Sequence, residues 1–107
     1  ILLEKKGPPP SINLFNENYV CMMNQSHKFA NEKKLSIKQY LSIKHLRVAP
    51  VDAPVAPIDR SLSQLNLERN IFVRIDLITL APSILANSDL VLTLPSETAK
   101  RMSKNYN

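Results

Sequence analysis

The sequence predicts an α/β fold with a mostly parallel sheet, and three observations support this. Residues 45–95 alternate three apolar, strand-like segments with two short helical patterns, an order typical of parallel βαβ units. A proline stands at the start of each helical pattern, where its fixed φ suits the first helical turn. The chain has 107 residues, 44% of them hydrophobic, which is enough for one small domain with an aliphatic core.

The N-terminal segment is predicted to differ from the rest of the chain. Residues 1–18 are expected to form a hinge strand, at Ile1–Glu4, and a proline-rich connector. The run 7–11 contains the glycine and three prolines, which break regular structure because proline lacks an N–H donor. Residues 19–107 are expected to form a single lobe, whose first strand covers Asn18–Met23.

The middle of the chain predicts a helix, a strand and a rigid loop. Ser36 is expected to cap a helix over about residues 36–44, since apolar residues recur there at i, i+3 and i+4. A strand follows at His45–Ala49. The segment Pro50–Pro57 is apolar but contains three prolines, which exclude a central strand. Open α/β sheets bind ligands at loops of this kind, beyond the carboxyl end of a strand.

A second helix is expected over residues 58–66, beginning at Pro57 or Ile58. Its buried stripe is predicted to consist of Ile58, Leu62 and Leu65. Asn66 stands where a left-handed residue commonly ends a helix, a position that suits glycine best and asparagine second. The pattern therefore predicts both the helix and the residue that terminates it.

The last third of the chain predicts two strands and two helices. The strands are expected at Ile71–Leu77, which is rich in β-branched residues, and at Leu90–Leu94. A short helix runs from Pro82 or Ser83 to about residue 87, and the final helix has Ser96 as its N-cap. The final helix is expected to turn Ala99 and Met102 inward and to pair Glu97 with Arg101.

The composition disfavours several classes of function. Gly7 is the only glycine, whereas phosphate loops and dinucleotide folds need several. The net charge of +5 comes from scattered basic residues without interleaved aromatic rings, which is typical of a solvated surface and not of a nucleic-acid groove. No apolar run approaches the ~18 residues that span a bilayer. We therefore expect neither nucleotide nor membrane binding.

No pattern of residues predicts an active site or a metal site. Cys21 is the only cysteine and lies in a strand-like run, so we expect a small buried hydrophobe without a disulfide, which suits a cytosolic protein. His27 and His45 lack neighbouring ligands for a metal. No serine stands in a nucleophile elbow. We expect a protein that is not an enzyme and that needs no cofactor or metal.

Several short motifs follow one another from Tyr19 onward. A turn reading HKFA is centred on His27, and the helical run LSIKQYL comes after it. The run Ile58–Arg69 reads IDxxLxxLxLxR, and the run Ser88–Pro95 reads SDLVLTLP. In this order and spacing, the motifs resemble the effector-sensing region of LysR-type transcriptional regulators, in the subset that includes the nodulation-type regulators. The chain departs from the family pattern at Asn66, which replaces a glycine, and in the glycine-free loop after residue 50.

The resemblance implies a fold, a function and partners. The fold is one lobe of a periplasmic-binding-protein type 2-like pair, a three-layer sandwich, and this chain resembles the second lobe alone. The function is to bind a small-molecule co-inducer of unknown identity and thereby control DNA binding in the intact, cytoplasmic protein. The resemblance implies a homo-oligomer formed through helix 58–66 and strand 71–77, and DNA contact only through a missing N-terminal helix-turn-helix domain. The alternative is a lobe of a solute-binding transport protein, which has the same architecture.

The effector cleft of such a lobe faces the carboxyl ends of strands and the amino ends of helices. Two loops meet this condition, one after His45–Ala49 and one at Leu77–Ala81. The helices that follow them offer unpaired N–H groups that suit a small carboxylate, although the charges of Asp52 and Asp76 oppose one. Ordinary loop packing is the alternative for each residue. The predicted effector-binding residues are Ala49, Pro50, Val51, Asp52, Leu77 and Thr79.

Overall fold

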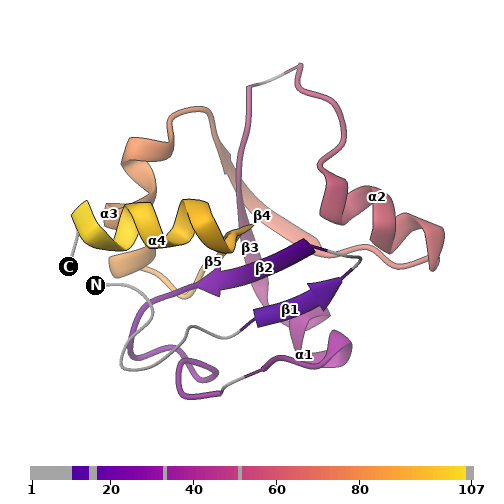
Figure 1. Cartoon of the computed structure of the whole chain (residues 1–107), viewed down its shortest axis with the longest axis horizontal. Helices are drawn as coiled ribbons and strands as arrows, with labels where there is room; N and C mark the ends of the chain where they lie inside the picture. Colours follow the sequence, from indigo (N-terminus) through magenta and orange to yellow (C-terminus); the bar gives the residue numbers. More distant parts are fainter. Residues whose placement is uncertain (1–10, 15–16, 33, 51, 106–107) are drawn as a thin grey trace.

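The computed structural model describes residues 11–14, 17–32, 34–50 and 52–105 (Figure 1). Two features predicted from the sequence, the strand at Ile1–Glu4 and most of the proline run after it, lie outside these residues. Val51, one of the predicted effector-binding residues, also lies outside them.

The described strands form one five-stranded sheet in the order β1-β2-β5-β3-β4. The strands are β1 (Ser11–Leu14), β2 (Glu17–Met22), β3 (Lys44–Val48), β4 (Asn70–Ile75) and β5 (Val91–Pro95). Strand β3 is parallel to both β4 and β5. The predicted βαβαβ unit is therefore confirmed for these three strands.

The prediction of a mostly parallel sheet is wrong for the sheet as a whole. Strand β2 is antiparallel to β1 and to β5, so half of the described strand pairs are antiparallel. Only two residues separate β1 from β2, and so short a connection allows an antiparallel pair alone. Strand β1 itself falls where the sequence predicted a connector.

Helices cover both faces of the sheet and give a three-layer arrangement (Figure 1). Helices α1 (Ile37–Leu41) and α2 (Pro57–Gln64) pack on one face, with Cys21 and Val91 of the sheet. Helices α3 (Ala81–Ala86) and α4 (Ser96–Asn105) pack on the other. Alternate residues of a strand point to opposite faces, so the apolar side chains of β2 contribute to the cores on both faces of the sheet.

Helix α1 begins as predicted but ends earlier. Ser36 is its N-cap: the Ser36 hydroxyl accepts from the Gln39 N–H at 3.1 Å, and the Gln39 side chain accepts from the Ser36 N–H at 2.9 Å. This reciprocal pair is a capping box. The helix ends at Leu41 and not near residue 44, because Ser42 caps it and β3 starts at Lys44.

Helix α2 confirms most of its predicted pattern. Ile58 and Leu62 are buried, but Leu65 is 61% exposed, so its predicted place in the buried stripe is wrong. The helix ends before Leu65, and Asn66 then adopts the predicted left-handed conformation, with φ of 60°. The chain reverses there, and the Leu67 N–H donates to the Leu62 carbonyl at 2.8 Å. This reversal turns Leu65 outward.

The segment that follows β4 differs from the expected loop. Strand β4 ends at Ile75, and a 3-10 helix, η1 (Ile78–Leu80), runs directly into α3. The Leu80 N–H donates to the Leu77 carbonyl at 3.1 Å. The predicted loop at 77–81 is therefore largely helical, and α3 begins at Ala81 because η1 supplies its preceding turn.

Helix α4 keeps its predicted inner face. Ala99 is buried and Met102 packs against the same apolar cluster, as expected. Ser96 lies within the helix as its first residue and is not a cap outside it, since β5 continues to Pro95. Glu97 pairs with Lys100 at 3.8 Å, one residue before the predicted partner Arg101.

Candidate functional site

The sheet divides at its carboxyl end, between β3 and β5. These strands pair at only two positions, His45 with Val91 and Leu46 with Leu92. Beyond them, β3 continues to pair with β4, and β5 continues to pair with β2. The ends of β3 and β5 therefore form a fork without ladder hydrogen bonds across it.

The fork is also the point where the chain leaves the sheet in opposite directions. From β3 the chain runs to α2, which packs on one face. From β5 it runs to α4, which packs on the other. Open α/β sheets bind ligands at such a crevice, because the diverging connections leave room outside the strand ends.

A pocket of about 360 Å³ occupies this fork. We call it the fork pocket. Residues 46–49 of β3 and its exit form one wall, and residues 92–95 of β5 form the other. The loop 53–56 and the start of α2 close one side. Most of these side chains are aliphatic or proline, and a mostly apolar lining with few polar groups is typical of small-molecule sites.

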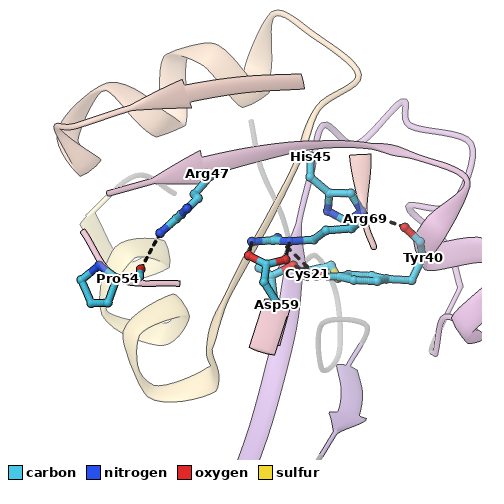
Figure 2. Close-up of polar contacts among 8 residues, drawn as sticks. Cys21, Tyr40, His45, Arg47, Pro54, Asp59 and Arg69 are labelled. Atoms are coloured by element: carbon cyan, nitrogen blue, oxygen red, sulfur yellow. Dashed lines mark hydrogen bonds and ion pairs between the residues drawn. The ribbon is translucent and has the colours of Figure 1, made fainter. Parts of the chain in front are cut away.

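Arg47 brings a positive charge into the lining of the fork pocket. Its Nη2 donates to the Pro54 carbonyl at 2.8 Å, as Figure 2 shows. Its Nε is buried and has no hydrogen-bond partner. Among the described residues, no carboxylate forms an ion pair with it. The guanidinium is thus held by one carbonyl and keeps unused capacity to donate.

A second arginine reaches the same pocket from a buried network. Arg69 is 6% exposed. It donates two hydrogen bonds to Asp59, from Nε to Oδ1 at 2.6 Å and from Nη2 to Oδ2 at 3.0 Å (Figure 2). Its Nη1 donates to the Tyr40 hydroxyl at 3.4 Å. Burial works to lower the pKa of Arg69, but the hydrogen bonds and charge of Asp59 outweigh it and raise that pKa. Arg69 is therefore a fixed cation with its charge already paired.

The network continues from Tyr40 into the sheet. The Tyr40 hydroxyl lies 2.6 Å from the Thr93 hydroxyl, which in turn lies 4.0 Å from the Cys21 sulfur. Burial raises the pKa of Tyr40 to about 12 and that of Cys21 to about 12. Both groups stay protonated at neutral pH, so Cys21 is not a thiolate nucleophile. Its predicted role as a small buried residue is confirmed by its 1% exposure.

His45 supports this network from β3. It is fully buried, and burial lowers its pKa to about 4. Its Nε2 lies 2.7 Å from the Tyr40 carbonyl, which only accepts, so the neutral ring carries its proton on Nε2. Its Nδ1 has no partner. The imidazole packs on the Tyr40 ring at 4.4 Å between centroids and acts as a structural donor.

The residues predicted to contact an effector lie around the carboxyl ends of β3 and β4. The Ala49 N–H donates to the Ile75 carbonyl at 2.9 Å, so the two predicted segments leave the sheet side by side. Among the predicted residues, Ala49 lines the fork pocket. The Pro50 carbonyl accepts from Arg74 Nη2 at 3.0 Å, outside the lining.

The other predicted residues are more exposed. Asp52 is exposed in a turn, Leu77 is 57% exposed before η1, and Thr79 is exposed within η1. None of the three lines the fork pocket. Whether they contact an effector stays a prediction.

Two polar residues in the lining of the fork pocket, Arg47 and Thr93, were not predicted from the sequence. The usable signal was Arg47 itself, a charged residue inside the run His45–Ala49 that was predicted as a strand. A charge in such a strand needs a partner or a function. Thr93 carried no comparable signal, since threonine is common in strands.

In the part of the chain that the structure describes, no three His, Cys, Asp or Glu side chains gather as metal ligands would. Within the same residues, every helix is too short or too polar to cross a membrane.

No protein-family model matches the chain. Two curated proteins are similar in sequence. The HTH-type transcriptional activator NagR of Ralstonia sp. is 27% identical over 88 residues, which cover 82% of this chain and 29% of that protein. Nodulation protein D 1 of Rhizobium leguminosarum bv. phaseoli is 27% identical over 96 residues, which cover 89% of this chain and 30% of that protein. The chain thus spans less than a third of the length of either relative.

Solved structures share the fold. Regulator PA0477 of Pseudomonas aeruginosa superposes with a TM-score of 0.66 over 95% of this chain and 34% of its own, at 22% identity. A transcriptional regulator from Vibrio parahaemolyticus gives 0.64 over 90% and 44%, at 25% identity. The regulatory domain of MexT, a transcriptional activator of Pseudomonas aeruginosa, gives 0.62 over 98% and 50%, at 13% identity.

The chain thus shares its fold with the regulatory domain of a transcriptional activator, and its sequence is similar to those of curated regulators. Both curated relatives are LysR-type regulators, and the motifs that suggested this resemblance lie within the region that the fold matches. The resemblance of the chain to the effector-binding region of LysR-type regulators is therefore confirmed.

Proposed function

We propose that this chain is the ligand-sensing second lobe of the effector-binding region of a LysR-type regulator, with a periplasmic-binding-protein type 2-like architecture. The observation that carries the proposal is the fork pocket, an apolar pocket at the strand ends of a fold shared with regulatory domains. The similar proteins are regulators, so the alternative of a transport-protein lobe is not supported.

In this proposal the lobe is one half of a ligand clamp. An effector in the cleft binds one arrangement of the two lobes more tightly than another and thereby shifts their equilibrium. The intact oligomer couples this shift to DNA affinity through a separate helix-turn-helix domain, and the coupling is reciprocal. The chain described here contributes the sensing surface around the fork pocket and the adjacent exits of β3 and β4.

The predicted effector-binding residues fit this surface to different degrees. Ala49 lies in the pocket wall, next to the exit of β4. Leu77 and Thr79 are exposed beyond that exit, where a second lobe could cover them. In the proposal, Ala49 contacts the effector within this lobe, whereas Leu77 and Thr79 contact it from the rim.

A fragment screen by NMR tests the sensing role. We expect members of a library of small neutral and anionic molecules to shift the amide signals of Ala49, Val55 and Thr93, which line the fork pocket. Ala49→Trp fills the pocket and should abolish these shifts, whereas Lys38→Trp, on the exposed side of α1, should preserve them. Fragments that bind only elsewhere on the chain would refute the proposed site.

We also propose that α2 and β4 form an oligomer interface in the intact protein. Strand β4 is an edge of the described sheet. Its Ile71 and Phe72 are 38% and 59% exposed, and Leu65 beyond α2 is 61% exposed. Large apolar side chains gathered at a sheet edge are costly to leave in water and favour a partner surface.

A charge placed in this interface tests the oligomer. In the intact regulator, Phe72→Glu should shift sedimentation toward the monomer, because the new carboxylate loses water on association. Lys38→Glu makes a charge change at an exposed position of α1 and serves as the control. An unchanged oligomeric state in the Phe72 variant would overturn the interface.

A further inference from the structure

Arg47 and Arg69 present the same edge of their guanidinium groups to different partners. Arg69 uses Nε and Nη2 together to hold both oxygens of the Asp59 carboxylate. Arg47 uses Nη2 for the Pro54 carbonyl, and its Nε has no partner. This edge matches a carboxylate because its two N–H groups are parallel, whereas one carbonyl oxygen fills only part of it.

The charges around Arg47 leave it available to an external anion. Asp59 is the acidic residue at the start of α2, and both of its oxygens are engaged by Arg69. Glu68 lines a second pocket that Arg47 also borders, without forming an ion pair there. Asp52 is exposed and does not line the fork pocket. The fork pocket itself is lined by Arg47 and Arg69 and by no carboxylate.

The start of α2 adds a weaker preference of the same sign. Residues 56–58 line the fork pocket, and the N-cap Ala56 offers no side-chain hydrogen bond. The first-turn N–H groups of the helix therefore lack a side-chain acceptor, and the helix end carries partial positive charge. Pro57 lacks an N–H, so the groups available are those after it.

We propose that the effector of this lobe is a small carboxylate on an apolar body, and that its carboxylate binds the Nε–Nη2 edge of Arg47. This rests on the proposed sensing function and names the class of ligand for it. The apolar body lies against the aliphatic walls of the fork pocket, whose volume of about 360 Å³ falls at the lower end of the ordinary range for small-molecule sites.

Binding in this mode exchanges one partner of Arg47 for another. The carboxylate takes the buried Nε–H and competes with the Pro54 carbonyl for Nη2. A hydrogen bond to a charged acceptor is stronger than one to a neutral carbonyl, so the exchange favours the ligand. Because the Pro54 carbonyl loses its donor when the carboxylate takes Nη2, binding is linked to the position of the loop.

A matched pair of probes tests the charge of the ligand without any mutation. Cyclohexanecarboxylate and cyclohexanecarboxamide have the same shape and differ in charge. In NMR titrations of the 107-residue chain, the carboxylate should shift Ala49 and Thr93 and bind roughly tenfold to a hundredfold more tightly than the amide. Equal affinity of the two probes within the pocket would overturn the anion proposal and leave the sensing site standing. Absence of shifts there with both probes would overturn both.

Three variants identify the arginine. Arg47→Gln should reduce the preference for the carboxylate to about onefold to threefold, since the charge-assisted pair is lost. Arg74→Gln is the matched control, because Arg74 also donates to a carbonyl of the same loop, that of Pro50, but does not line the pocket. Loss of the preference in both variants would show a general charge effect and overturn the assignment to Arg47. Arg47→Lys keeps the charge without the paired edge and should bind the carboxylate at an intermediate level.

Discussion

The two arginines at the fork pocket show how one residue type serves structure in one place and recognition in another. Arg69 is buried, and its paired edge is filled by Asp59 from the same chain. Arg47 borders the pocket, and its equivalent edge is only half used. A filled edge fixes the fold around it, whereas a half-filled edge leaves a strong donor for a ligand. The difference lies in the partner and not in the residue.

The largest effect on stability is expected from breaking the pair of Arg69 and Asp59. Asp59→Ala leaves the Arg69 guanidinium buried without its carboxylate, which should lower the free energy of unfolding by about 3–5 kcal/mol. Urea denaturation followed by circular dichroism measures the change. Glu97→Ala breaks an ion pair between exposed side chains and should change the stability by less than about 1 kcal/mol. Equal effects of the two substitutions would contradict the structural role of Asp59.

A smaller loss is expected from the hydroxyl that links Arg69 to the sheet. Tyr40→Phe removes the partner of Arg69 Nη1 and of the Thr93 hydroxyl and should cost about 1–3 kcal/mol. Thr93→Val removes the other end of the Tyr40–Thr93 bond. If that bond couples the two residues, the double variant will cost less than the sum of the single ones. Strict additivity would show that the network is not energetically connected.

The pH dependence of stability tests the same region through His45. Burial holds the pKa of His45 at about 4 in the folded chain, below the 6.5 of a free imidazole. Between these values the unfolded chain binds the proton and the folded chain does not, so stability falls as the pH decreases from about 6.5 towards 4. The slope should approach 1.4 kcal/mol per pH unit at most, as about one proton is involved.

A variant isolates this contribution. His45→Asn removes the titrating group but leaves His27, whose pKa burial also lowers, so the difference between the two slopes belongs to His45. Measurements between pH 5 and 6.5 avoid most carboxylate titration. A variant that retained the full slope of the wild-type chain would contradict the buried, neutral state of His45.

The smallest change in stability is expected on replacing Arg47, whose Nε–Nη2 edge is only half used. Arg47→Gln loses one hydrogen bond, to the Pro54 carbonyl, and should cost about 1 kcal/mol or less. The contrast with Asp59→Ala sharpens the comparison, because each substitution breaks the hydrogen bonding of one of the two arginines. Thermal unfolding is sufficient to measure it. A loss as large as that of the Asp59 variant would mean that Arg47 is structural as well.

Local patterns in the sequence predicted the parts of the fold that local interactions determine. The Ser36 cap and the left-handed Asn66 were predicted because each depends on a few neighbouring residues. The parallel unit of β3, β4 and β5 followed from the alternation of strands and helices. Leu65 was misplaced, since its apolar character continued the helical pattern after the helix itself had ended.

The site depended on contacts that the sequence does not reveal. Tyr40 and Thr93 are 53 residues apart and meet only because β5 lies beside β3. The fork exists because the pairing of these strands stops after Leu46 and Leu92, and no local signal marks that point. Sequence reasoning therefore pointed to the edge of the sheet where the fork pocket lies, with Ala49 in its lining, but did not identify Arg47 as its charged group.

The most direct measurement follows the Nε–H signals of the two arginines while cyclohexanecarboxylate is added to the ¹⁵N-labelled chain. We expect the Arg47 signal to shift and saturate together with the Ala49 amide, while the Arg69 signal stays in place because Arg69 is already bonded to Asp59. A saturating titration in which Arg47 does not move, or in which Arg69 moves in its stead, would contradict the division of roles between the two residues.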